Sequence, residues 1–280
     1  MTEPLVPSHV AFTPYEISLC LHDVQRTRLW KEAIEETVKV GDVVIDAGSG
    51  TGILGVFAAL AGARKVYCIE LHPRFVRLIR HLAARNGLSE VIEVIHGDAT
   101  RVTVPERANV LICELLCTGQ FFEPEVQVIN HLRHFLEEGA AIIPRKVRSY
   151  ARLLDAQELL YGVRIDVDSR SVVMDDDEPV SSRVCYDEID FMSGAAHGLE
   201  VDTAVEVVAR RTRLADAVMI EGEAELTEDI QTIPTRFLYN PEVIFLREPL
   251  ELVAGDRYQV HIAYPYGGDT LDATIRVEPG

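Results

Sequence analysis

A glycine-rich turn between two apolar segments constrains the fold of this chain more than any other feature. The turn, DAGSGTG at 46–52, follows the apolar run 43–46 and precedes the apolar helical segment 53–63. Glycines permit a tight strand-to-helix turn and let a ligand approach the backbone, where the N–H groups at the helix start are free to bind it. The segment therefore predicts a cofactor site in an α/β fold.

Strands and helices alternate along the following hundred residues or so. Apolar runs at 66–70, 91–98, 109–114 and 140–144 predict strands, and the segments 73–86 and 125–138 have helical spacing. This alternation is typical of a doubly wound, Rossmann-like parallel sheet, whose ligands bind beyond the carboxyl ends of the strands. A further helical segment, 15–38, precedes the first strand.

The pattern changes after Pro144. Short alternating segments without intervening helices predict strands at 171–174, 204–210, 217–226, 242–246, 250–255, 257–264 and 273–278. Such strands suggest a β-barrel or sandwich. We therefore expect three parts: N-terminal helices that cap the cofactor site (1–40), a Rossmann-like cofactor domain (41–145) and a β-barrel substrate domain (146–280).

Composition excludes several classes of partner. The chain has 27 basic and 45 acidic residues, a net charge of −18, which would repel a nucleic-acid backbone. No apolar run reaches the roughly 18 residues of a membrane span, and the N-terminus does not resemble a signal peptide. Five scattered cysteines indicate reduced thiols in a cytoplasmic protein. His131 and His134 have no carboxylate at suitable spacing, so we expect no metal site.

Two cofactors use the geometry of the glycine turn. Gly50-x-Gly52-x-x-Gly55, with Glu70 twenty residues after Gly50, matches the dinucleotide fingerprint. However, the carboxylate of Asp46 would oppose a pyrophosphate. S-adenosylmethionine carries no phosphate, and its sulfonium and ammonium groups tolerate acids. Asp98, after the third strand, can meet the adenine edge. The residues favour S-adenosylmethionine, with a dinucleotide or a purely structural turn as alternatives.

Several segments resemble the protein arginine methyltransferases. Residues 43–70 resemble the cofactor motif of that family, and DVQRT at 23–27 resembles its Asp-x-x-Arg-Thr segment, whose arginine (Arg26 here) holds the cofactor's carboxylate. CELLCTGQFFE at 113–123 resembles the double-glutamate loop, with Glu114 and Glu123 nine residues apart. FLREPLELVAGDRYQV at 245–260 resembles the stretch that closes the family's β-barrel.

This resemblance implies an S-adenosylmethionine-dependent N-methyltransferase and a set of site residues. Glu114 and Glu123 would be catalytic, because two carboxylates can clamp a planar guanidinium and orient its remaining nitrogen. Glu123 could instead only start a helix, where the helix dipole favours an acid. The expected cofactor residues are Arg26, Asp46, Gly48, Ser49, Gly50, Thr51, Gly52, Glu70, Leu71, Asp98, Ala99 and Glu114.

The sequence also departs from the family pattern. Phe237-Leu238-Tyr239 stand in place of a Thr-His-Trp loop, so Leu238 replaces a histidine, for which His261 is a weak substitute. The paired-tyrosine helix is reduced to Phe12 and Tyr15. Thr100 stands where relatives often hold adenine with a glutamate.

These departures leave the acceptor open. It is an arginine-like guanidino group of a protein, a peptide or free arginine, or else a small-molecule amine or hydroxyl; a catalytically silent cofactor-binding scaffold is the third alternative. The family's dimerisation arm would fall within 155–185, a stretch that looks short, so a homodimer also stays open.

Overall fold

β1 (Val43–Ala47) is the central strand of a five-stranded parallel sheet with the order β3-β2-β1-β4-β5. The computed structural model describes residues 13–156, 159–164, 167–235 and 237–280. The other strands are β2 (Lys65–Glu70), β3 (Ile92–His96), β4 (Ala108–Cys113) and β5 (Leu136–Ile143), and the helices between them are α3 (Ile53–Leu60), α4 (Pro73–Arg85) and α5 (Glu125–Leu132). All five residues of β1 are buried, which explains its unbroken apolar character apart from Asp46.

Two helices precede this sheet where the sequence suggested one continuous segment. α1 (Pro14–His22) ends and α2 (Val24–Thr37) begins at Asp23, whose backbone N–H bonds the Leu19 and Cys20 carbonyls. The Asp23 side chain then accepts the backbone N–H of Arg26 at 3.1 Å and caps α2. Trp30 is fully buried in the core. Residues 1–12, including Phe12, lie outside the described residues.

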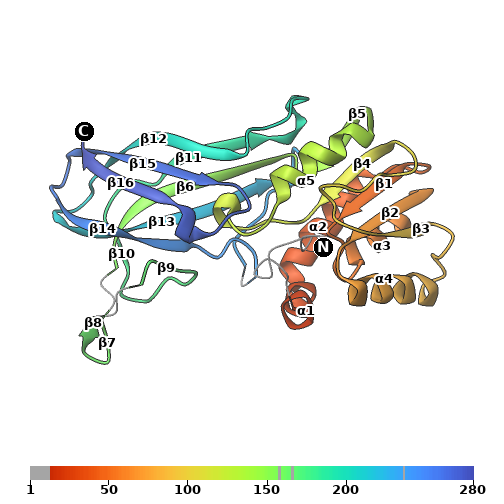
Figure 1. The fold of residues 1–280 in the computed structure, drawn as a ribbon, viewed down its shortest axis with the longest axis horizontal. Coiled ribbons are helices and arrows are strands. Elements are labelled where there is room, and N and C mark those ends of the chain that lie inside the picture. The colour runs from red at the N-terminus through yellow and green to blue at the C-terminus, as the bar shows by residue number, and fades with distance from the viewer. Residues whose placement is uncertain (1–12, 157–158, 165–166, 236) are drawn as a thin grey trace, which may run out of the picture.

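The second half of the chain is antiparallel. One sheet has the order β10-β6-β13-β14-β9, with β11 also paired to β6; a second has the order β12-β15-β16. Their bounds are β6 (Lys146–Asp155), β9 (Ser169–Arg170), β10 (Glu178–Pro179), β11 (Val184–Asp190), β12 (Glu200–Val208), β13 (Arg213–Glu225), β14 (Glu242–Leu252), β15 (Arg257–Pro265) and β16 (Thr274–Pro279). A small hairpin of β7 (Leu159–Leu160) and β8 (Val163–Arg164) projects from these sheets (Figure 1).

The two halves meet across the N-terminal helices. Figure 1 shows the parallel sheet at one end of the molecule, the antiparallel strands at the other, and α1 and α2 between them. The predicted fold class, a Rossmann-like sheet followed by a β-barrel or sandwich, is confirmed. In the described parts of the chain, no helix combines the length and the apolar character that crossing a membrane would require.

Three local predictions were wrong. Residues 171–174 form no strand, because the carboxylate of Asp177 accepts the Met174 N–H at 2.7 Å and closes a turn. The helix predicted over 125–138 ends at Leu132, since Leu136 already pairs with Ala108 in the sheet. The segment predicted to begin at 250 belongs to β14, which ends at Leu252.

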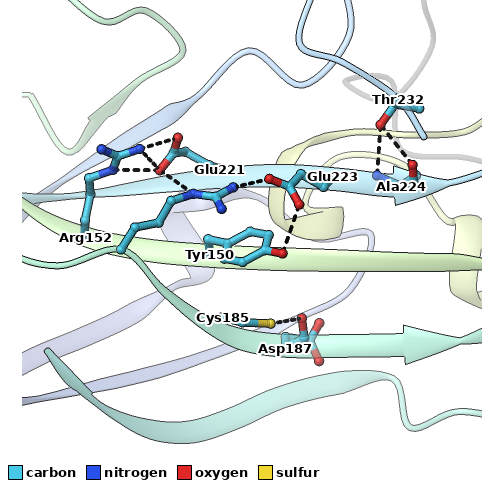
Figure 2. A network of polar contacts seen from close by, with 9 residues as sticks. Tyr150, Arg152, Cys185, Asp187, Glu221, Glu223, Ala224 and Thr232 are labelled. Atoms are coloured by element: carbon cyan, nitrogen blue, oxygen red, sulfur yellow. Dashed lines mark hydrogen bonds and ion pairs between the residues drawn. The ribbon is translucent and has the colours of Figure 1, made fainter.

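Two long strands, β6 and β11, and the four two-residue strands β7 to β10 were not predicted. Every second residue of β6 is buried, while its other face carries basic side chains. Arg152 donates two hydrogen bonds to Glu221 on β13, and Arg183 bridges Glu221 and Glu223 (Figure 2). These two acidic residues of the C-terminal half are therefore paired within the sheet.

Candidate active site

The glycine turn borders a cavity of about 330 Å³, within the usual range for small-ligand sites. The cavity is lined by most of the predicted site residues: Arg26, Gly48, Ser49, Gly50, Thr51, Glu70, Leu71, Asp98, Ala99, Glu114 and Glu123. Residues that sequence reasoning missed also line it, among them Ile17 and Leu21 of α1, Phe75, Leu115, Val128 and Phe237. Helical spacing alone gives no signal for which face of α1 covers a ligand.

The backbone of the turn requires glycine. Gly48, Gly50 and Gly52 all have positive φ, between 53° and 81°, which side chains of L-residues rarely adopt. A Cβ on Gly48 would lie 2.6 Å from the Leu115 side chain, and one on Gly52 would lie 2.9 Å from Ile79. Gly52 thus packs behind the turn, while Gly50 has ordinary room in front of it.

Asp46 supports the turn from behind and does not line the cavity. Its side chain is buried and accepts the Gly55 backbone N–H at 3.0 Å, at the start of α3. Burial raises the pKa of Asp46 to about 7, and the hydrogen bonds that its carboxylate accepts from Gly55 and Cys68 oppose the shift. Asp46 therefore positions the strand-to-helix connection.

Glu70 and Asp98 line the cavity at the ends of two neighbouring strands, β2 and β3. Glu70, at the end of β2, accepts the backbone N–H of Gly50 at 2.8 Å and that of His72 at 2.7 Å. Burial raises the pKa of Glu70. Asp98 accepts both the backbone N–H and the hydroxyl of Thr100, at 2.9 and 2.7 Å. Both carboxylates are held in fixed orientations by short local contacts.

The opposite part of the cavity holds Arg26, Glu114 and Glu123. The guanidinium of Arg26 is bonded to the Glu114 carboxylate and to the Cys20 carbonyl. Burial, followed by the negative charge of Glu114, raises the pKa of Glu123 to about 8, although Arg26 opposes the shift. No cation pairs with Glu123 in the described parts of the chain. This end of the site has an acid that lacks a positive partner.

Antiparallel strands of the second half fix the loop that carries the two glutamates. The Thr118 hydroxyl donates to the Asn240 carbonyl at 2.7 Å, and the Gly267 N–H donates to the Gln120 carbonyl at 2.8 Å. The ring of Phe121 packs on that of Tyr264, with centroids 4.2 Å apart. The position of Glu123 therefore depends on both halves of the chain.

The segment that replaces the Thr-His-Trp loop provides no titratable group to the cavity. Phe237 lines the cavity, Leu238 is buried, and the buried Tyr239 packs against Gly222. His261 is exposed on β15, 3.1 Å from Glu278, and does not line the cavity. Within the described ranges, no group of three His, Cys, Asp or Glu residues could hold a metal ion.

The residues present fit S-adenosylmethionine. The cavity wall is largely apolar, its carboxylates suit hydroxyl, ammonium and sulfonium groups, and the absence of a basic cluster around the turn disfavours a pyrophosphate. Arg26 is the cation available for a carboxylate, and its buried Nε has no partner among the described residues.

Comparisons with known proteins agree with this chemistry. The family model for ribosomal protein L11 methyltransferase matches residues 23–144. An uncharacterised protein of Methanocaldococcus jannaschii is 34% identical over 251 residues, which cover 89% of this chain and 91% of that protein. An arginine N(omega)-methyltransferase of Streptomyces achromogenes subsp. streptozoticus is 32% identical over 50% of this chain and 40% of its own length. The protein arginine N-methyltransferase 7 of Danio rerio is 31% identical over 55% of this chain and 25% of its own length.

A solved structure has the same fold over nearly the whole chain. The solved structure of the Trypanosoma brucei PRMT1 enzyme–prozyme heterotetrameric complex with AdoHcy superimposes with a TM-score of 0.79 at 20% identity, covering 95% of this chain and 94% of that one. The chain belongs to the class I S-adenosylmethionine-dependent methyltransferases, and arginine N-methyltransferases are among its homologues. This arginine methyltransferase homologue is an S-adenosylmethionine-dependent methyltransferase, although it spans less than half the length of the relatives whose activity is named.

Proposed function

We propose that the protein transfers a methyl group to the guanidino nitrogen of an arginine-like acceptor. The observation that carries the proposal is the position of Glu114 and Glu123, which line the same cavity as the glycine turn. Glu123 has no cationic partner among the described residues. A guanidinium would supply that charge and could bond both carboxylates.

The two glutamates would act in different ways. Glu114 is already bonded to Arg26, so its orientation is set before an acceptor arrives. Glu123 would bind the acceptor as a carboxylate and could take the proton that the nitrogen releases, since its pKa lies near 8. S-adenosylmethionine, when bound, supplies an electrophilic methyl group on a sulfonium. The chain's contribution is to hold the guanidinium, concentrate its charge near the carboxylates and keep one nitrogen oriented.

The names of relatives and the segment around Leu238 bear on the nature of the acceptor. The relatives include one named arginine N(omega)-methyltransferase and one named protein arginine N-methyltransferase. Leu238 at the place of the family histidine favours a second candidate, a small-molecule amine or hydroxyl whose proton leaves by another route. A catalytically silent scaffold is the third.

Mass spectrometry of the acceptor separates these candidates. The protein is incubated with S-adenosylmethionine and either free arginine, an arginine-rich peptide or a panel of amines and alcohols. A 14 Da gain on arginine or the peptide, lost in Glu123→Gln and Glu114→Gln while both variants still bind S-adenosylhomocysteine, is expected. A gain only on another acceptor class would replace the guanidino proposal, and intact cofactor binding without any product would indicate a scaffold.

Three further proposals concern the setting of the reaction. We infer that residues 41–145 form the cofactor domain, that 146–280 form the substrate domain, and that the helices before residue 40 cap the cofactor. All five cysteines are unpaired, which supports a reducing, cytoplasmic location. The T. brucei relative forms a heterotetramer, and the projecting β7–β8 hairpin supports a homodimer for this chain.

A further inference from the structure

Asp23 has contacts in two directions. One carboxylate oxygen accepts the backbone N–H of Arg26 at 3.1 Å, and the other accepts the hydroxyl of Thr235 at 2.5 Å. Thr235 lies 212 residues away along the chain, between β13 and β14. A hydrogen bond to a carboxylate is stronger than one between neutral groups, so this contact is a substantial tie between α2 and the antiparallel half.

The contact acts close to Arg26. Asp23 starts α2, and Arg26 is in the first turn of that helix, with its guanidinium bonded to Glu114. A shift of Asp23 would move the start of α2 and therefore the guanidinium. Arg26 has little freedom to compensate, because its side chain is buried.

Thr235 does not line the cavity, but it contacts the segment that does. Its backbone N–H donates to the Leu238 carbonyl at 3.1 Å, which closes a turn that includes Phe237. Phe237 lines the cavity that Arg26 and Glu123 share. Thr235 therefore joins two elements of the site, the arginine helix and the Phe237 turn.

We propose that Thr235 is a positioning residue for cofactor binding, which acts through Asp23 on Arg26. The antiparallel half of the protein thereby contributes to cofactor affinity without touching the cofactor. This proposal rests on the proposed function for its account of the acceptor. Its effect on cofactor binding, however, can be measured without an acceptor.

A second tie between the same elements offers a matched control. At the other end of α2, the Thr227 hydroxyl donates to Glu36 at 3.3 Å. Glu36 is exposed and far along the helix from Arg26. Glu36→Ala therefore removes a contact between α2 and the antiparallel half without disturbing the start of the helix.

Calorimetry of S-adenosylhomocysteine binding tests the proposal. Thr235→Val should raise the Kd about fivefold to tenfold, Thr235→Ser should restore it, and Glu36→Ala should leave it unchanged. Asp23→Asn should weaken binding too, and the double variant Asp23→Asn/Thr235→Val should be no weaker than the worse single variant. The midpoint of thermal unfolding, measured alongside, should stay close to that of the wild type for Thr235→Val.

Other outcomes would overturn it. Wild-type affinity in Thr235→Val, or equal losses in Thr235→Val and Glu36→Ala, would show that the contact only holds the fold together. If Thr235→Val does not fold, Thr235→Ala takes its place, and additive losses in the combination Asp23→Asn/Thr235→Ala would have the same meaning. Once an acceptor is identified, Thr235→Val should raise KM for S-adenosylmethionine with kcat at saturation within about twofold. Failure to methylate any guanidino acceptor would refute the proposed function and leave the cofactor measurement valid.

Discussion

Arg26 donates to the carboxylate of Glu114, although 88 residues separate them in the chain. The pair joins the helix that covers the cofactor site to the first glutamate of the acceptor site. Arg26 therefore has two tasks, since the cation expected to hold the cofactor also orients an acceptor carboxylate. Among the residues that the structure describes, the first glutamate thus has a cationic partner and the second has none.

Arg26→Lys is expected to weaken the binding of both the cofactor and the acceptor. A lysine keeps the charge but loses the planar set of donors that can serve Glu114 and a second carboxylate together. We expect S-adenosylhomocysteine to bind at least about tenfold more weakly, and KM for the acceptor to rise. Calorimetry and steady-state kinetics would measure the two effects. A loss confined to the cofactor would show that the bond to Glu114 has no role in acceptor binding.

The activity should depend on the titration of Glu123. Its pKa is near 8 in the free site, and a guanidinium requires the ionised form. The value of kcat/KM for the acceptor should therefore rise with pH, by up to about tenfold per unit, and level off above about pH 8. The Kd of S-adenosylhomocysteine should not follow this profile. A flat profile between pH 6 and 8 would mean that Glu123 is already ionised.

Glu123 should also lower the stability of the protein at alkaline pH. Its folded pKa of about 8 lies above the ordinary value of 4.5, so folding favours the protonated form. The resulting stabilisation is present below about pH 4.5 and is lost as the pH rises through 8. Glu123→Gln should thus be more stable than the wild type at pH 8.5, by up to about 4 kcal/mol. Urea denaturation at pH 6 and 8.5 would show whether the difference grows with pH; a constant difference would contradict the prediction.

Two glycines with similar backbone angles should respond differently to alanine. Gly41 has a φ of +93° and open space around it, so Gly41→Ala should cost about 1 kcal/mol of stability. Gly48→Ala adds a Cβ 2.6 Å from Leu115 at a φ of +70°. It should cost about 2 kcal/mol or more and weaken S-adenosylhomocysteine binding, whereas Gly41→Ala should not. Denaturation and calorimetry on both variants check this, and equal effects would show that the cavity wall tolerates the change.

The β7–β8 hairpin should matter for self-association. Tyr161 at its tip is fully exposed, and Val163 is 57% exposed. If the hairpin contacts a second copy, Tyr161→Ser/Val163→Ser should shift the mass measured by light scattering from dimer to monomer. Val253→Ser, a change at another exposed valine, is the control. A monomeric wild-type protein would exclude the homodimer.

Local sequence patterns predicted the cofactor half well because its three inner strands, β1, β2 and β4, are largely buried on both faces. The apolar run at 43–46 was expected to be a strand, and it is the central one of the sheet; the glycines of 46–52 form the expected turn. Glu70 follows the next strand, so its position at the same edge of the sheet was also predictable.

The remaining features depend on contacts between distant segments. β6 was not recognised as a strand because one of its faces carries basic side chains. Arg152 on that face is paired with Glu221 of the neighbouring strand, and this pairing cannot be read from the local sequence. Similarly, nothing in the sequence of α1 indicates that Ile17 and Leu21 face a cavity. The bond between Asp23 and Thr235 joins segments that no local pattern relates.

The loop of Glu114 and Glu123 belongs by sequence to the cofactor half but is held by Asn240, Gly267 and Tyr264 of the other half. Acceptor preference can therefore diverge through substitutions in the antiparallel strands, while the methyl-donor site keeps its sequence. Conversely, transplanting the loop alone into another methyltransferase would carry the two acids without the means of placing them. Acceptor recognition therefore depends on the loop together with the segments of the antiparallel half that contact it, which carry Asn240, Gly267 and Tyr264.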